Sequence, residues 1–283
     1  MVCSLGGGKA LFNLCMALYA EAQPFIERLQ LKKSAVHPHF QIFEGPDTRL
    51  IITGLGEVQA AVAAAYYLAN YPMEENDIFW NVGVAAAKAT RFQLGTCCVC
   101  NKIVELSTGR TFYPDMLFRH PFFEAELQTS PQTAVQGVGK EVLIDMEAAG
   151  IYQAAQPFCR LHQLAFFKVV SDRADGKLVK PEQVRSLIAV HTETIIHLAL
   201  QVQKALQARR ITRFTDLEQK EIDRAAAEHG LSLTQQRQME QYLYYDKLQG
   251  GSLPALLSEM PGRMDPGKQE GKRYLEQLRA HIL

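Results

Sequence analysis

The stretch "VLIDMEAAGIY", residues 142 to 152, places two carboxylates in an otherwise apolar run. Asp145 and Glu147 flank Met146, with apolar residues before them and small or apolar residues after them. Burying an unpaired carboxylate costs free energy because the charge loses its hydration. Two acids in such a run therefore indicate groups that bind something, either a ligand or another part of the protein.

The composition is that of an ordinary globular protein. The chain has 283 residues, of which 47% are hydrophobic and 21% are charged, enough for one large domain or for a domain with an appendage. Its 30 basic and 30 acidic residues cancel, so charge gives no reason to expect nucleic acid, an anionic membrane or an acidic partner. No run reaches the roughly 18 apolar residues of a membrane span.

The six cysteines do not have the spacing of a metal site. Three of them form "CCVC" at residues 97 to 100, and no second C-x-x-C or H-x-x-x-H supplies further zinc ligands. We expect reduced thiols in a half-buried strand, which favours the cytoplasm, and we expect no metal. The N-terminal run "KALFNLCMALYAEA" resembles a weak signal peptide, but Asn13 interrupts it, so a buried first strand is the preferred interpretation.

Strands and helices alternate along the first two hundred residues. Residues 11 to 20 are typical of a buried strand, with a helix over 20 to 30 in which Pro24 is near the first turn. "RLIITGLGEVQAAVAAAYYLANY" (49–71) predicts strand, glycine turn and helix, and "DIFWNVGVAAA" (77–87) repeats strand and glycine turn. Further strands are expected at 95–106 and 164–172, and a long amphipathic helix at 181–208. This alternation predicts an α/β domain with a largely parallel core sheet.

The pattern changes after about residue 210. "TDLE" at 215 to 218 is a capping box that opens a helix ending at Gly230, and shorter helices follow, separated by "QGGSLP" and "MPGRMDPG". We expect "YLYYDK" at 242 to 247 to contribute core aromatic side chains. The sequence thus predicts an α/β domain over residues 1–210 and an all-helical appendage over 211–283, serving in packing or oligomerisation.

Four stretches together resemble the purine nucleoside phosphorylase/5'-methylthioadenosine–S-adenosylhomocysteine nucleosidase superfamily. They are "ALYAEAQPF" (17–25), "TGLGEVQAAVAAAYYL" (53–68), "NVGVAAA" (81–87) and the pair "DMEAAGIY" (145–152) with "VVSDRADG" (169–176). Their order covers roughly residues 11 to 205. The resemblance implies a mixed sheet surrounded by helices, a homodimer, a small-molecule nucleoside as substrate and no cofactor.

The same resemblance implies roles for individual residues. Asp172 matches the acid that protonates or hydrogen-bonds the purine at N7, and Glu21 matches the glutamate that activates water. Glu147 matches the carboxylate that binds the ribose hydroxyls, with Met146 packing on the sugar. These roles fit glycoside cleavage, which needs an acid for the leaving group, a base for water and a carboxylate near the developing positive charge.

Other residues in these stretches are expected at the substrate. By resemblance, Ser171 orients the neighbouring acid, and Gly83, Val84 and Leu55 contribute to substrate binding. Each acid also has a plain structural interpretation. Glu21 and Glu147 suit the first turn of a helix, where an acid is favourable, and aspartates such as Asp172 often form turns at strand ends.

The pattern favours water over phosphate as nucleophile. Asn81 stands where phosphorylases of the family carry an arginine, and no glycine–arginine phosphate loop follows the first strand, although phosphate needs several donors or cations. We therefore expect an enzyme that hydrolyses the N-glycosidic bond of a purine nucleoside, in particular a 5'-modified adenine nucleoside such as methylthioadenosine or S-adenosylhomocysteine.

Three departures from the family pattern leave alternatives open. Val84 replaces a serine, Lys168 replaces an arginine, and the loop that supplies the base-stacking aromatic has no recognisable match. Aromatic residues that would substitute, with core packing expected for most, are Phe112, Tyr113, Phe118, Phe122 and Phe123. The alternatives are a purine nucleoside phosphorylase, a futalosine-type hydrolase, or a non-catalytic nucleoside- or partner-binding protein on the same fold.

Overall fold

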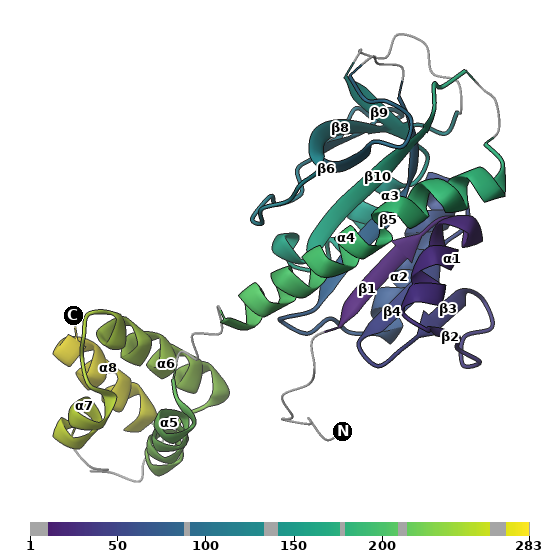
Figure 1. Cartoon of the computed structure of the whole chain (residues 1–283). Coiled ribbons are helices and arrows are strands. Elements are labelled where there is room, and N and C mark those ends of the chain that lie inside the picture. Colours follow the sequence, from purple (N-terminus) through teal and green to yellow (C-terminus); the bar gives the residue numbers. More distant parts are fainter. Residues whose placement is uncertain are drawn as a thin grey trace. The chain divides into compact units, whose positions relative to one another are not determined.

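A computed structural model describes residues 11–87, 91–132, 141–175, 179–208, 214–260 and 270–282. By its internal contacts the chain divides into two compact units, residues 1–207 and residues 208–283 (Figure 1). The larger unit carries the sheet and the smaller unit is helical. Within the described residues, no helix is both long enough and apolar enough to cross a membrane.

The larger unit is built on a mixed sheet in the order β10-β6-β8-β9-β5-β1-β4-β3-β2, with β7 paired to β6. The strands are β1 (Phe12–Met16), β2 (Lys32–Lys33), β3 (Gln41–Glu44), β4 (Thr48–Ile52), β5 (Ile78–Ala87), β6 (Cys97–Glu105), β7 (Thr111–Phe112), β8 (Phe123–Thr129), β9 (Val142–Asp145) and β10 (Leu164–Asp172). The first strand is fully buried, as predicted. The described cysteines are all free and buried, rather than half-buried.

Strand β5 joins two parts of the sheet. It pairs with both β1 and β10 in parallel. Beyond Gly83 it also pairs with β9, in the antiparallel direction. Because β10, β6, β8 and β9 lead back to β5, these five strands close on themselves, and β1, β4, β3 and β2 extend from them. The carboxyl ends of the parallel strands β1, β5 and β10 consequently meet at one edge, where α/β sheets place ligands.

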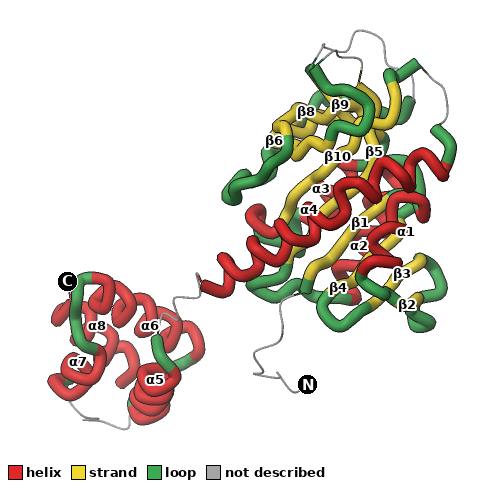
Figure 2. The backbone as a smooth tube through the Cα atoms, in the orientation of Figure 1, coloured by secondary structure: helices red, strands yellow, loops and turns green. Residues whose placement is uncertain are grey.

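Helices cover the sheet on two faces. Figure 1 shows α1 (Tyr19–Arg28) and α4 (Pro181–Ala208) in front of the strands, with α2 (Glu57–Asn70) and α3 (Ala148–Ala155) behind them. Neighbouring side chains of β5 follow this division, since Phe79 packs in the core with α2 and α3 and Trp80 packs in the core with α1 and α4. The predicted α/β fold with a mixed sheet between helices is confirmed (Figure 2).

Two local predictions are wrong. Gly83 is not in a turn but inside β5, where its backbone pairs with Lys168 of β10 and so continues the strand to Ala87. The first strand ends at Met16, earlier than predicted, and α1 begins at Tyr19, so Pro24 lies inside the helix, past its first turn. The early helix start has a physical cause, since the Glu21 carboxylate binds the backbone of the connecting turn.

The smaller unit consists of α5 (Asp216–Glu228), α6 (Leu233–Leu248), α7 (Leu253–Glu259) and α8 (Glu270–Ile282) around its own apolar core. The predicted capping box is present, because the Thr215 hydroxyl accepts from the Glu218 N–H, and Gly230 follows the end of the helix with φ +62°. Within "YLYYDK", Leu243 is buried and two tyrosines are packed against the core. Of "MPGRMDPG", residues 261–267 lie outside the described residues.

Helices α2 and α3 approach closely at Gly150. A Cβ atom at this position would lie 2.4 Å from the backbone oxygen of Glu57, at the start of α2. We expect Gly150→Ala to destabilise the protein by about 1–3 kcal/mol, because overpacking against backbone forces the helices apart. At an open helix position the same change stabilises. Urea unfolding of both proteins checks this, and an unchanged or raised midpoint would show that the contact is not restrictive.

Candidate active site

Glu21 is held at the carboxyl edge of the sheet by backbone groups. Its Oε2 accepts from the N–H groups of Ala17 and Leu18, both at 2.9 Å, and its Oε1 accepts from the Val84 N–H at 2.8 Å. The neighbouring Gly83 makes room for it, since a Cβ there would lie 2.8 Å from Glu21 Oε1. The carboxylate is thus buried, fixed in orientation and placed where β1 has ended beside β5.

Burial is the main influence on the charge of Glu21. Loss of hydration raises the pKa of this carboxyl, while the positive charge of Lys168 and the N–H groups of Val84, Leu18 and Ala17 lower it in part. The net effect is a raised pKa. A carboxylate whose pKa is moved toward neutrality is a stronger base than an exposed glutamate.

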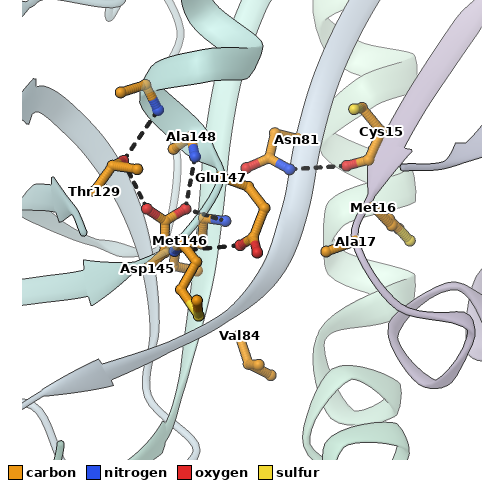
Figure 3. Close-up of polar contacts among 12 residues, drawn as sticks. Cys15, Met16, Ala17, Asn81, Val84, Thr129, Asp145, Met146, Glu147 and Ala148 are labelled. Atoms are coloured by element: carbon orange, nitrogen blue, oxygen red, sulfur yellow. Dashed lines mark hydrogen bonds and ion pairs between the residues drawn. The ribbon is translucent and has the colours of Figure 1, made fainter. Parts of the chain in front are cut away.

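The first carboxylate of the opening stretch, Asp145, binds the protein itself. Its Oδ1 accepts from the Thr129 hydroxyl at 2.7 Å, and its Oδ2 accepts from the Ala148 N–H at 3.0 Å (Figure 3). The Ala149 N–H donates in turn to the Thr129 hydroxyl at 3.0 Å. Asp145 and Thr129 together therefore satisfy two free N–H groups at the start of α3, and Asp145 forms a buried ion pair with Lys168 at 2.8 Å.

The second carboxylate, Glu147, is left available for other contacts. It occupies the position before α3 without capping that helix with its side chain. Figure 3 shows its carboxylate pointing away from Thr129, toward the side on which Ala17 lies. Its Oε1 accepts from the Gly56 N–H at 2.9 Å, and Gly56 has φ +96°, a backbone conformation that favours glycine.

Burial raises the pKa of Glu147 to about 7, and the negative charge of Asp145 contributes to the increase. Lys168 and the Gly56 N–H act in the opposite direction. A carboxyl group in this range changes its protonation state near neutral pH, which is uncommon for glutamate and frequent at functional sites.

Asp172 ends β10 in a tight turn. The Ser171 hydroxyl donates to its Oδ2 at 2.7 Å, and the Ala174 N–H donates to its Oδ1 at 2.8 Å. Ala174 has φ +54°, which is uncommon for a residue other than glycine. Ser171 therefore lies beside the acid and fixes its orientation, and each carboxylate oxygen keeps a further lone pair for a ligand.

Glu21, Glu147 and Asp172 line a single pocket, which we call the carboxylate pocket. Of the other residues expected at the substrate, Met146, Ser171, Val84 and Leu55 also line it, whereas Gly83 lies beneath Glu21 and does not. Its remaining lining residues are Ala17, Leu18, Ala85, Ala86, Gln132, Ile144, Asp145, Val179 and Val184. Among the described residues that line the pocket there is no lysine or arginine.

The residues that depart from the family pattern lie at different places around the pocket. Val84 puts an apolar side chain in the pocket, while its N–H holds Glu21. Lys168 is buried behind the pocket, and the Asn81 amide donates to the Cys15 carbonyl oxygen at 2.9 Å. Of the five aromatic candidates, all within the described residues, none lines the pocket. Phe112, Phe118 and Phe122 pack against core aromatic rings, and Tyr113 and Phe123 are exposed.

Several contributors were not found from the sequence. Thr129 and Gln132 come from β8 and the residues after it, which carry no recognisable motif, and a hydroxyl in a strand gives no signal of the helix it will cap. The sequence predicts a glycine turn before α2, but it gives no signal that the Gly56 N–H binds Glu147. The unusual Lys168 was the available signal for the buried ion pair, because lysine is rarely placed inside a strand of a core sheet without a partner.

The fold has counterparts among solved structures. No model of a protein family matches the chain, and no curated protein matches it. Among solved structures, the apo 5'-methylthioadenosine nucleosidase of Arabidopsis thaliana is 16% identical, with 70% of this chain and 96% of that chain covered and a TM-score of 0.55. The 5'-methylthioadenosine/S-adenosylhomocysteine nucleosidase of Campylobacter jejuni is 13% identical. The match covers 68% of this chain and 99% of that chain, with a TM-score of 0.55.

The chain has the nucleosidase fold. A futalosine hydrolase mutant of Helicobacter pylori shares this fold with it at 11% identity, 68% and 99% coverage and a TM-score of 0.55. These structures are covered almost completely, and they match about 70% of this chain. The nucleosidase fold accounts for the way in which the ends of β1, β5 and β10 meet at the carboxylate pocket.

The raised pKa of Glu147 makes stability depend on pH. In the unfolded chain this carboxyl ionises near 4.5, and in the folded protein near 7, so the folded state binds the proton more tightly. The contribution of the protonated Glu147 carboxyl to the free energy of unfolding is therefore fully present below pH 4.5 and is lost as the pH rises through about 7. We expect Glu147→Gln to be more stable than the native protein at pH 8, by on the order of 2–3 kcal/mol, with the difference vanishing toward pH 4.5.

Urea unfolding of the two proteins at pH 4.5, 6 and 8 measures this difference. Glu141→Gln is a suitable control, since this glutamate is largely exposed and its removal should leave the pH dependence unchanged. A difference that is equal at pH 4.5 and pH 8 would contradict the assignment.

Proposed function

We propose that this protein hydrolyses the N-glycosidic bond of a purine nucleoside, giving the free base and a ribose derivative. The 5'-modified adenine nucleosides are the substrate class that we favour. The observation that carries the proposal is that Glu21, Glu147 and Asp172, from three distant segments of the chain, line one pocket. Solved structures with the same fold include nucleosidases, which supports the choice of reaction.

Each carboxylate has a role that fits its surroundings. Asp172, fixed by Ser171 and the Ala174 N–H, provides or holds a proton at N7 of the base as the C–N bond breaks. Glu21 takes a proton from the attacking water, which adds to the anomeric carbon. Glu147 accepts from the ribose hydroxyls and, with Met146 beside the sugar, stabilises the positive charge of the oxocarbenium-like transition state.

The lining of the carboxylate pocket supports water as the nucleophile. Phosphate is an anion that needs cations or several donors, and the described lining residues include four acids (Glu21, Asp145, Glu147 and Asp172) and no lysine or arginine. The Asn81 amide nitrogen, at the position of the phosphorylase arginine, is occupied by the Cys15 carbonyl oxygen. An anionic nucleophile or a phosphorylated nucleoside is therefore disfavoured.

The test is release of free base in phosphate-free buffer from methylthioadenosine, S-adenosylhomocysteine, 5'-deoxyadenosine, inosine and futalosine, followed by chromatography. We expect release from at least one adenine nucleoside. Asp172→Asn and Glu21→Gln should each lower its rate by about 10²–10⁴-fold, because each removes a proton-transfer group. Glu141→Gln, an exposed change on the same unit, should keep the native rate.

Other outcomes identify the alternatives. Release that requires added phosphate would make the protein a phosphorylase, and release from futalosine alone would make it a futalosine-type hydrolase. No release from any of the five, with or without phosphate, would contradict enzymatic cleavage and favour a nucleoside- or partner-binding protein.

The proposal includes a homodimer and a cytoplasmic location. The outer face of α2 carries Val58 and Val62, which are 78% and 54% exposed, and the nearby Leu55 is exposed and also lines the carboxylate pocket. Exposed aliphatic side chains in such a row are typical of an interface. Free, buried thiols suit a reducing compartment.

We expect the native protein to have the mass of a dimer by size exclusion with light scattering. The double variant Val58→Glu/Val62→Glu should have the mass of a monomer, because it places two charges in the apolar contact. Val190→Glu, at a similarly exposed valine of α4, should remain dimeric. A native monomer, or a double variant that stays dimeric, would exclude an interface at this face of α2.

A further inference from the structure

Lys168 is a charged residue in the interior of the protein. It lies in β10 directly opposite Gly83 of β5, and it is 2% exposed. An ammonium group removed from water is very unfavourable unless it is paired and hydrogen-bonded. Its nearest partner is Asp145, whose Oδ2 lies 2.8 Å from the Nζ atom.

The groups that face Lys168 come from several elements. Asp145 is at the end of β9, Glu147 precedes α3 and Glu21 is in α1, and all three act on the ammonium electrostatically. Two thiols, Cys15 of β1 and Cys100 of β6, also face it, and burial raises the pKa of both, so they are neutral. A single ammonium is therefore surrounded by three carboxyl groups and two neutral thiols.

The ion pair is connected to the pocket through α3. Asp145 Oδ2, which binds Lys168, also accepts from the Ala148 N–H, and Oδ1 accepts from Thr129. Asp145 is thus fixed from three sides, and it fixes the start of the helix from which Glu147 reaches the pocket. Lys168 itself does not line the pocket and is too deep to touch a substrate there.

We propose that Lys168 is a positioning residue, which holds Asp145 and the start of α3 and supplies the positive charge that lets Glu21 and Glu147 be buried together. This inference rests on the proposed function, because it concerns the same carboxylates. A lysine suits the place, since its compact ammonium is a point charge with three donors, whereas an arginine would present a planar fork.

The ionisation of the carboxyl groups agrees with this geometry. Burial raises the pKa of Glu21 and of Glu147, and Lys168 opposes both increases. Asp145 has the opposite influence on Glu147 and raises its pKa. Burial by itself lowers the pKa of Lys168, but Asp145, Glu147 and Glu21 raise it well above its usual range, so the ammonium keeps its charge.

These opposite influences give a test that a purely structural role would not pass. The 283-residue chain is labelled with carboxyl-¹³C glutamate, and the titration of each glutamate carboxyl is followed by NMR, with Glu21→Gln and Glu147→Gln assigning the signals. In Lys168→Gln, we expect the titration midpoints of Glu21 and Glu147 to rise by about one pH unit or more. In Asp145→Asn, the Glu147 midpoint should fall, and Lys168→Arg should keep both midpoints near the native values.

The fall of kcat/KM at low pH gives a second measurement of the Glu21 pKa. Glu21 must be ionised to act as a base, so a higher pKa in Lys168→Gln should move that fall to higher pH. The inference would be overturned if the Glu21 and Glu147 midpoints do not change in Lys168→Gln. It would also be overturned if the Glu147 midpoint rises in Asp145→Asn, as it is expected to do in Lys168→Gln. If Lys168→Gln does not fold, the double variant Lys168→Gln/Asp145→Asn, which removes both charges of the buried pair, decides. Its Glu21 midpoint should be higher than that of Asp145→Asn, because only the double variant lacks the ammonium, and equal midpoints would overturn the inference.

The test of the role of Lys168 can fail independently of the test of the proposed reaction. NMR titration needs no turnover, so shifted midpoints in a protein that releases no base would leave the role of Lys168 intact and remove the proposed reaction. Base release together with unshifted midpoints would support the proposed reaction and remove the role of Lys168.

Discussion

The pair between Lys168 and Asp145 is the interaction on which the arrangement of the carboxylate pocket depends. Three carboxylates near one another in an apolar interior repel each other and lose hydration, and the ammonium offsets both costs. Asp145 uses its remaining lone pairs to bind Thr129 and the start of α3. Asp145 and Glu147, which are separated only by Met146, therefore have different roles. Asp145 binds groups of the protein, and Glu147 is directed into the pocket.

Glycines complete the pocket by permitting close approach. Gly83 leaves the space that Glu21 occupies beside β5, Gly150 lets α3 contact the backbone of α2, and Gly56 turns its N–H toward Glu147 in a conformation that other residues rarely adopt. Each is within a stretch that also carries a carboxylate or faces one. The positions of the acids are therefore set by backbone contacts as much as by their own side chains.

The fold was predictable because its signals are local. Alternating apolar runs, glycine turns and the long amphipathic pattern of residues 181–208 predicted β1, β4, β5, β6, β10 and the helices α1, α2 and α4, and the capping box at Thr215 predicted the start of α5. The strands β2, β3, β7 and β8 were not predicted. The two wrong predictions have tertiary causes. Gly83 continues a strand because β10 pairs with it, and the first helix begins early because Glu21 binds the turn that precedes it.

The sequence by itself determined the fold class and the longer helices and strands, since these depend on periodicity and on motifs within short stretches. The tertiary structure decided what the carboxylates Glu21, Asp145 and Glu147 contact. Asp145 meets Lys168 and Thr129, and Glu147 meets Gly56, across 16 to 91 positions of the chain, and the closure of β10 and β9 onto β5 brings them together. Such pairings follow from strand register and helix packing, which no single stretch of residues contains.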